Sequence, residues 1–179
     1  MVDDLVSDAV RLGSELPARP EGIAALLHRH DDVLDDVERP ALVHFDLWDG
    51  NVFVERARGG RWRITGLIDG ERAFFGDPVA EFVSLALYRD LAETPELLTG
   101  YAAGSDTPPT WLSVGSDSSV VLTRAGRRRL LLYGAYLYLV MCIEGVTRGF
   151  DGPEHEGFRQ RVLALLELQL ERLDSLRSS

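Results

Sequence analysis

The sequence predicts a mainly helical α+β protein in which one small β-hairpin carries the polar side chains of a functional site. Two observations support this fold class. Apolar residues recur at helical spacing through most of the chain, which is typical of helices that bury one face. Alternating apolar runs flank the turn at Gly59-Gly60, which indicates a hairpin. At 179 residues the chain can form one domain with a core, so we expect a single domain over residues 1–179.

The charge of the chain restricts its partners. The net charge is −10, from 29 acidic and 19 basic residues. This balance disfavours nucleic acid as a partner, because phosphate binding needs a basic face. The acidity has two interpretations: a plain solvated surface, or a negative cleft that attracts a polycationic substrate.

The cellular location is predicted from three features. Cys142 is the only cysteine, which excludes an internal disulfide and favours a reducing compartment. The first residues lack the basic and apolar regions of a signal peptide, so we expect a cytoplasmic protein. The longest apolar stretch, residues 130–143, has about 14 residues, fewer than the roughly 20 that span a bilayer. We therefore predict a buried helix there and no membrane partner.

Two helices are expected before residue 40. Apolar residues have helical spacing over residues 3–16, and the prolines of residues 17–20 end this helix. A second helix is expected over residues 21–37. It contains His28 and His30, which are two positions apart and do not face each other on a helix. We therefore expect no metal site at this pair.

A polar loop comes directly before the predicted hairpin. It reads His44-Phe45-Asp46-Leu47-Trp48-Asp49-Gly50-Asn51. The pattern H-x-D-L-x-x-x-N has the spacing of a kinase catalytic loop. The apolar runs at residues 52–54 and 62–68 form the hairpin, which ends on an aspartate. Its two strands should hold Asp46, Asn51 and Asp69 at the same end.

These three side chains suit phosphoryl transfer. The reaction needs a carboxylate that orients the attacking hydroxyl and accepts its proton, together with oxygen ligands for Mg²⁺. Asp46 suits the first task. Asn51 and Asp69 suit the second, because hard cations bind carboxylate and amide oxygens.

At these residues the chain resembles the aminoglycoside phosphotransferase family, also called the phosphotransferase enzyme family, which has the protein-kinase-like fold. The resemblance is carried by residues 44–52, by Ile68-Asp69-Gly70-Glu71 and by Gly76-Asp77-Pro78, in the order that is usual in the family. It is densest over residues 41–82 and extends more loosely into the helical remainder. The implied fold is the C-terminal helical lobe of a protein-kinase-like enzyme.

The resemblance implies a Mg²⁺-dependent transfer of the γ-phosphate of ATP or GTP to a hydroxyl of a small molecule. An aminoglycoside or a related aminosugar antibiotic is the implied acceptor class, which would make the protein an antibiotic-resistance kinase. Asp46 would be the catalytic base, and Asn51 and Asp69 would hold the metal. In this fold the equivalent of His44 usually braces the loop by hydrogen bonding, and we expect that role here.

The implied substrate is cationic and hydroxylated. Candidates for binding it are Trp48, Asp49, Glu71 and Glu144. Trp48 either packs against the loop or forms a wall of the pocket. Asp49 either helps to turn the loop or attracts a substrate ammonium. Glu71 either contacts the substrate or pairs with Arg72.

A helix is expected over residues 78–91, packed under the hairpin. Asp77 would be its N-cap, Pro78 its first residue, and Glu81 a first-turn acid near the positive helix end. We therefore assign Asp77 and Glu81 to helix capping rather than to catalysis. Two positions depart from the family pattern: Phe45 stands where these kinases usually have Gly, and Glu81 where they often have Asp.

The remainder of the chain is expected to consist of helices around one loop. The helices are predicted over residues 95–103, 124–149 and 154–176. Residues 104–119 are rich in Gly, Ser, Asp, Thr and Pro and lack periodicity, so we expect a loop there.

The residues before the polar loop do not fit the nucleotide-clamping lobe of this family. They read as helix, they contain no glycine-rich loop, and all 19 basic residues of the chain are Arg, so the lysine that pairs with the ATP phosphates is missing. We expect the C-terminal lobe alone, as a helical hairpin (1–40), a site segment (41–77) and a helical subdomain (78–179). The face that the absent N-terminal lobe would cover should be apolar, and self-association would hide it.

Two alternatives stay open at this point. The first is a non-catalytic small-molecule-binding lobe, a truncated or degenerate relative that keeps the substrate pocket without a nucleotide clamp. The second is a metal-dependent phosphohydrolase that uses the same acids, and it is the weakest, because such sites normally bring His ligands or more acids and the chain has four His. The sequence also leaves open whether the chain is a fragment, a standalone protein or half of a two-chain enzyme.

Overall fold

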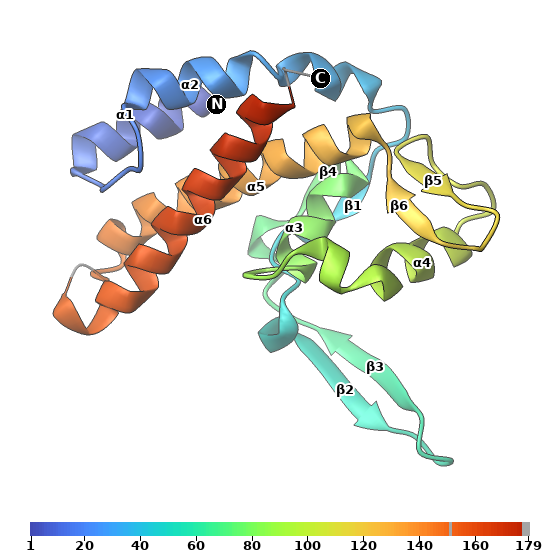
Figure 1. The fold of residues 1–179 in the computed structure, drawn as a ribbon. Coiled ribbons are helices and arrows are strands. Elements are labelled where there is room, and N and C mark those ends of the chain that lie inside the picture. Colours follow the sequence, from blue (N-terminus) through green and yellow to red (C-terminus); the bar gives the residue numbers. More distant parts are fainter. Residues whose placement is uncertain (151, 177–179) are drawn as a thin grey trace. The chain divides into compact units, whose positions relative to one another are not determined.

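The computed structural model of the protein describes residues 1–150 and 152–176 (Figure 1). The described chain is mainly helical with small antiparallel sheets, which confirms the predicted α+β class. It divides into two compact units. We call Met1–Asp36 with Arg127–Ser179 the helical unit, and Val37–Gly126 the hairpin unit. The expected single domain, with segment boundaries at residues 40 and 77, stays a prediction.

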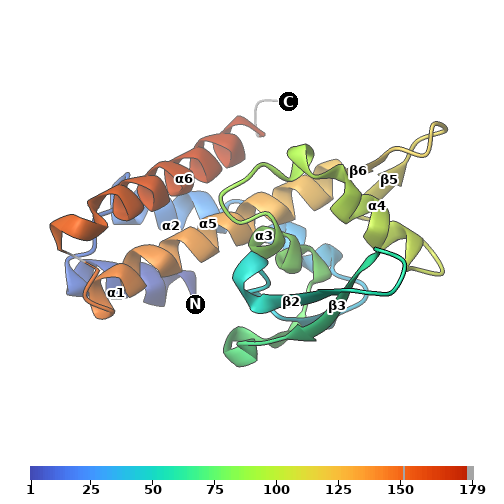
Figure 2. The ribbon, with the colours of Figure 1, turned by 90° about the horizontal axis from the view of Figure 1, so that it is seen from below.

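The described part of the helical unit is built from four α-helices. They are α1 (Val2–Leu12), α2 (Pro20–His28), most of α5 (Arg124–Thr147) and α6 (Glu156–Ser175). Figures 1 and 2 show α6 lying along α5, and Gly134 of α5 faces Gln169 of α6, whose Oε1 would lie 3.0 Å from a Cβ at position 134. Their buried side chains form an apolar core that includes Ile23, Leu27, Leu139, Leu166 and Leu173.

The long helix α5 contains the apolar stretch that the sequence singles out. By length and composition alone, α5 is long and apolar enough to cross a membrane. Within the structure 44% of its most apolar window is buried, and Leu131, Leu132 and Ala135 belong to the core.

The second predicted helix is shorter than expected. α2 ends at His28 rather than near residue 37, and the chain continues as a 3₁₀ helix at Asp31–Asp36. The N–H of His30 donates to the carbonyl of Leu27, three residues back, which tightens the chain after α2. The guanidinium of Arg128 donates to both carboxylate oxygens of Asp32, so a tertiary contact holds the tightened segment.

The hairpin unit contains three two-stranded antiparallel sheets within the described residues. They are β1 (Ala41–Val43) with β4 (Phe74–Gly76), β2 (Val52–Arg56) with β3 (Trp62–Leu67), and β5 (Leu112–Val114) with β6 (Val120–Leu122). Figure 1 shows β2 and β3 as a ribbon that extends from the rest of this unit. The ribbon is the hairpin that the alternating sequence pattern predicts.

Two short helices complete the hairpin unit. They are α3 (Glu81–Leu85) and α4 (Pro95–Ala103). The rings of Phe82, Tyr101 and Trp111 contact one another with centroids 5.2 to 5.5 Å apart, which joins both helices to the segment before β5. This aromatic cluster is the core beneath the site described below.

Two predictions for the hairpin unit are wrong in part. The helix expected over residues 78–91 starts as a 3₁₀ turn at Pro78–Ala80, and α3 ends at Leu85. The backbone leaves the helical conformation at Ala86, with a φ of −101° and a ψ of 28°, and Tyr88 is left-handed, with a φ of 64°, so the helix does not continue to residue 91. The loop expected over residues 104–119 contains strand β5, because the turn before β6 lets it fold back as a hairpin.

The structure predicts a pH dependence for the helical unit. His28 Nε2 lies 2.9 Å from Asp3 Oδ1, and its Nδ1 lies 3.6 Å from Asp31 Oδ2. The hydrogen bond to Asp3 is the main cause that raises the pKa of His28 above its ordinary value. The protonated ring therefore stabilises the fold below its unfolded pKa of about 6.5, and this contribution is lost as the pH rises through the higher folded pKa.

We expect His28→Gln to lower the melting temperature more at about pH 6 than at about pH 8.5. The corresponding difference in the free energy of unfolding should stay below about 1 kcal/mol, because the side chains are exposed and the interaction is screened by solvent. Thermal unfolding followed by circular dichroism at both pH values measures it. Asp3→Asn is the matched variant and should show the same pH dependence. An equal loss at both pH values would contradict the ion pair.

Candidate functional site

Strand pairing brings the polar loop and Asp69 to the same region of the hairpin unit. The loop of residues 44–51 runs from β1 to β2, and Asp69 lies between β3 and β4. Because β1 pairs with β4 and β2 pairs with β3, both ends of the loop are tied to strands that flank Asp69. The N–H of Ile68 donates to the carbonyl of Asn51 at 3.1 Å, which closes the arrangement.

The carboxylate of Glu81 holds the start of the loop. The N–H of His44 donates to Glu81 Oε2 at 2.6 Å, and the N–H of Phe45 donates to Glu81 Oε1 at 3.2 Å. Ser84 extends this contact, because its hydroxyl accepts the N–H of Leu47 at 3.0 Å. Hydrogen bonds to an ionised carboxylate are stronger than neutral ones. Glu81 lies in the first turn of α3, as predicted, and its oxygens also bind the loop backbone, which the sequence does not predict.

Phe45 adopts a backbone conformation that a bulky residue rarely adopts. Its φ is 60°, in the left-handed region that favours glycine. Its side chain is buried, and its ring meets that of Phe74 edge to face with centroids 5.5 Å apart. The buried ring and the bond to Glu81 hold Phe45 in this conformation, which explains how the chain tolerates an aromatic residue there.

His44 ties the loop to the end of β3. Its Nε2 lies 2.9 Å from the carbonyl oxygen of Ile68. A carbonyl only accepts hydrogen bonds, so Nε2 carries the proton. Nδ1 is buried and has no hydrogen-bond partner among residues 1–150 and 152–176. The observed bond is of the bracing kind that the resemblance implies for His44.

Asp46 and Asn51 contact each other directly. The Asn51 amide Nδ2 donates to the Asp46 carbonyl at 2.8 Å and approaches Asp46 Oδ2 at 3.4 Å. Asn51 is buried, whereas Asp46 is half-buried and can reach a ligand. The five-residue spacing thus places a carboxylate and an amide side by side, as the sequence predicts.

Asp69 stands at a sharp turn in the backbone. Its φ of 65° and ψ of 45° are left-handed, a conformation that Asp tolerates better than most residues. The preceding residue, Ile68, is bonded through its N–H to Asn51 and through its carbonyl to His44. These two bonds anchor the backbone at Asp69 next to the residues of the loop. The residue Asp69 itself is exposed.

The oxygen ligands fit a shared magnesium ion better than a protein-only metal cage. Across the described residues, no group of three or more His, Cys, Asp or Glu side chains is placed to hold a metal ion. Mg²⁺ keeps several waters and binds one or two carboxylates together with substrate phosphates. Asn51 uses its Nδ2 on Asp46, so its amide oxygen is the atom left to accept a ligand. Asn51 and Asp69 therefore supply the types of oxygen donor that a Mg²⁺ shared with a phosphate would use.

Three of the four candidate substrate residues lie in the hairpin unit, and the fourth lies in the helical unit. Trp48 is partly exposed, and its ring lies against Gly50, where a Cβ would overlap it. Asp49 is exposed and forms an ion pair with Arg89 at 3.3 Å. Glu71 is exposed in the turn after Asp69. These three lie in the hairpin unit, close in sequence to the loop or to Asp69.

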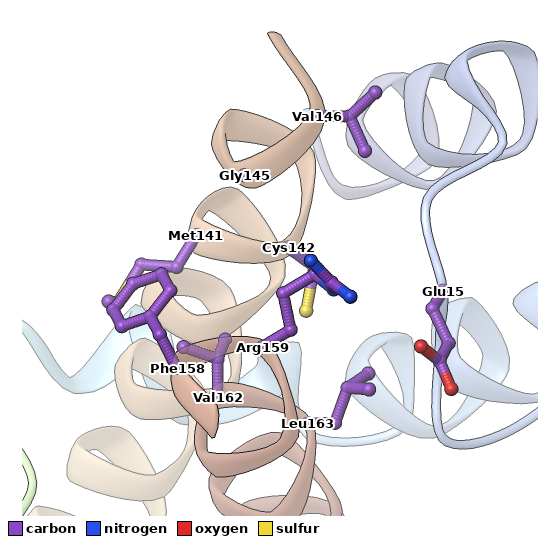
Figure 3. Close-up of a pocket in the computed structure, with 9 residues that line it drawn as sticks. All are labelled: Glu15, Met141, Cys142, Gly145, Val146, Phe158, Arg159, Val162 and Leu163. Atoms are coloured by element: carbon purple, nitrogen blue, oxygen red, sulfur yellow. The ribbon is translucent and has the colours of Figure 1, made fainter. Parts of the chain in front are cut away.

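Glu144 lies in the other unit, on α5, where it pairs with Arg148 at 3.6 Å. A pocket of the same helical unit lies between α5 and α6 (Figure 3). Its lining is mostly apolar and includes Cys142. Burial raises the pKa of Cys142 to about 12, and the charge of Glu15 adds to the effect. The thiol therefore stays protonated at neutral pH and is no nucleophile.

The sequence predicts the N-cap role of Asp77 but not the contacts that Glu81 and Ser84 make with the loop. Asp77 is the N-cap of the turn at Pro78–Ala80, and its Oδ1 accepts the N–H of Val79 at 3.0 Å. The loop-holding pair of Glu81 and Ser84 was not predicted. Their position one turn after the Gly-Asp-Pro step is the only sequence signal for it, and it is shared by ordinary first-turn acids.

A comparison with protein-family models identifies a family for this chain. The model of the phosphotransferase enzyme family matches residues 3–115, more than half of the chain. The matched range includes the polar loop, Asp69 and Glu81. Comparisons with curated proteins and with solved structures gave no match.

We expect Glu81→Ala to destabilise the protein by about 2 kcal/mol, because two loop N–H groups lose a charged acceptor. Urea unfolding measures the change. Glu81→Gln should cost less, since it keeps one acceptor oxygen, and Glu38→Ala, at an exposed acid of the same unit, should be near neutral. Equal stability of Glu81→Ala and the unmodified protein would show that the carboxylate does not hold the loop.

We expect Cys142 to react slowly with thiol reagents in the folded protein. At about pH 8 its raised pKa lowers the thiolate fraction on the order of a thousandfold relative to an ordinary cysteine. Labelling with a chromogenic disulfide in native buffer and in denaturant compares the two rates. Similar rates in both would contradict the buried environment of the thiol.

Proposed function

Since the chain belongs to the phosphotransferase enzyme family, we propose that its hairpin unit transfers the γ-phosphate of ATP to a hydroxyl group of a small molecule. The observation that carries this proposal is the contact between Asp46 and Asn51 beside the anchored backbone of Asp69. GTP would serve the same chemistry. Three separate motifs of the sequence converge here, which a chance match of one loop would not explain.

In this proposal Asp46 acts on the acceptor. Its half-buried carboxylate orients the attacking hydroxyl and accepts its proton as the bond to phosphorus forms. Asn51 keeps the Asp46 backbone in place through the 2.8 Å bond to its carbonyl. His44 contributes position rather than chemistry, because its protonated Nε2 is used on Ile68.

Asn51 and Asp69 would hold Mg²⁺ through the amide oxygen and the carboxylate. The bound ion would supply positive charge against the phosphate oxygens. The chain contains no lysine, so any side-chain cation that it brings to a nucleotide is an arginine or a histidine. We therefore propose weak or absent turnover by these 179 residues alone, because fixed positive charge supplies much of the rate in this chemistry.

The proposed acceptor is a cationic, hydroxylated molecule of the aminoglycoside or aminosugar class, and the proposed role is antibiotic resistance. The support is the net charge of −10 and the exposed acids Asp49 and Glu71 near the loop. A second candidate function is a small-molecule-binding lobe without nucleotide turnover. The absence of lysine favours it, because such a lobe needs no phosphate clamp.

Calorimetric titration of the protein with ATP, once in the presence of Mg²⁺ and once in the presence of EDTA, tests the kinase hypothesis. We expect binding that depends on Mg²⁺, and Asp69→Asn should weaken it at least about tenfold because one metal ligand is lost. Asp106→Asn, at an exposed acid of the same unit, is the control and should bind normally. Nucleotide binding that ignores both Mg²⁺ and Asp69 would overturn the metal site.

The same preparation, incubated with labelled ATP and a panel of aminosugars, measures transfer. Slow transfer that Asp46→Asn removes supports the kinase. Aminosugar binding without any nucleotide binding supports the binding lobe instead. Brisk transfer would show that the missing lysine is not needed.

A further inference from the structure

One face of the β2–β3 ribbon is apolar and open to solvent. The register pairs Val54 with Ile64 and Val52 with Leu67, and Trp62 lies two residues from Ile64, so these side chains share a face. We call Val54, Trp62, Ile64 and Leu67 the ribbon face. Their exposed fractions are 53%, 68%, 65% and 51%.

A two-stranded ribbon with such a face needs a partner. An isolated hairpin is marginally stable in water at best, and contiguous exposed apolar side chains mark interaction sites. Trp62, the most exposed of the four, is of the residue type that most often anchors a protein interface.

The two ends of the ribbon carry opposite charges. Arg56, Arg58 and Arg61 lie at the tip, around the turn in which Gly59 and Gly60 both have positive φ. Arg63 faces away from the ribbon face, because it is paired across the strands with Glu55.

At the base lie Asp49, before β2, and Asp69 and Glu71, after β3, and all three are exposed. Asp49 is already paired with Arg89 at 3.3 Å, so Asp69 and Glu71 carry most of the acidic charge there. The tip is thus basic in a chain whose net charge is −10, while the base is acidic.

We propose that two copies of this chain associate through their ribbon faces in an antiparallel arrangement. A twofold axis across the ribbon sets each basic tip against the acidic base of the other copy, and the apolar face is complementary to itself. A parallel arrangement would bring the arginine tips together, and like charges oppose it. The inference does not depend on the proposed phosphoryl transfer.

The size of the ribbon sets the strength of this association. Strands of five and six residues, at about 3.3 Å per residue, give a face about 20 Å long and two strands wide. Stable interfaces bury about 800 Å² on each partner, which is more than such a face offers. The dimer is therefore weak, with a dissociation constant in the micromolar range, on the order of 10–100 µM.

Sedimentation equilibrium of the 179-residue chain in buffer without divalent cations tests the proposal. We expect a monomer–dimer equilibrium between about 2 and 200 µM that is weakened at about 0.5 M NaCl, because salt screens the tip–base contacts. Val54→Ser should weaken the dimer about tenfold and Trp62→Ser about a hundredfold. Val121→Ser is the matched control, since Val121 is 52% exposed in β6, outside the ribbon, and should leave the constant unchanged.

A charge exchange tests the antiparallel arrangement itself. The tip variant Arg58→Glu with Arg61→Glu and the base variant Asp49→Arg with Glu71→Arg should each be monomeric alone, because every tip then meets a base of its own sign. Mixed together, they should form a heterodimer as strong as the dimer of the unmodified chain.

Circular dichroism shows that each variant is folded. A monomer at about 200 µM for the unmodified chain, an equal effect of Val121→Ser and Val54→Ser, or a mixture that stays monomeric would each overturn the proposal.

Discussion

The start of the loop that carries Asp46 is held by the carboxylate of Glu81. Glu81 accepts the N–H groups of His44 and Phe45, at 2.6 and 3.2 Å, in a segment that has no strand beside it. An N–H that loses its acceptor in the folded state costs about 1–3 kcal/mol, so Glu81 stabilises this path of the loop. Glu81, in the first turn of α3, thus provides hydrogen-bond acceptors to the loop, as the neighbouring strand β4 does to β1.

Two left-handed residues mark the points at which the site bends. Asp69 tolerates this conformation, because a short polar side chain fits it. For Phe45 the same conformation costs about 1–2 kcal/mol. The cost is offset by burial of its ring and by its edge contact with Phe74. Phe74 belongs to β4, the strand that follows the second motif, so the second motif supports the first through this contact as well as through the pairing of β1 with β4.

The local parts of this arrangement could be predicted from the sequence, and the long-range parts could not. The ribbon follows from alternating runs around two glycines, and the Asp46–Asn51 contact follows from a spacing of five. The pairing of β1 with β4 joins segments about thirty residues apart, and no local pattern encodes it. The early end of α3 reflects the backbone conformations of Ala86 and Tyr88, which helix periodicity does not reveal. Glu81 was assigned to a cap because an acid that stabilises a helix and an acid that binds a distant loop look alike in a sequence.

The acids of the proposed metal site also determine the charge at one end of the ribbon. Asp49 lies before β2, and Asp69 and Glu71 lie after β3, so the acids of this site gather at the base of the β2–β3 ribbon. Their charge makes one end of the ribbon negative, and the arginines around the Gly59-Gly60 turn make the other end positive. With an apolar face between these ends, the ribbon is dipolar, and its charge pattern is strongest when the acids hold no cation. A cation bound at Asp69 would reduce the negative charge at the base, so metal binding and ribbon pairing would draw on the same carboxylate.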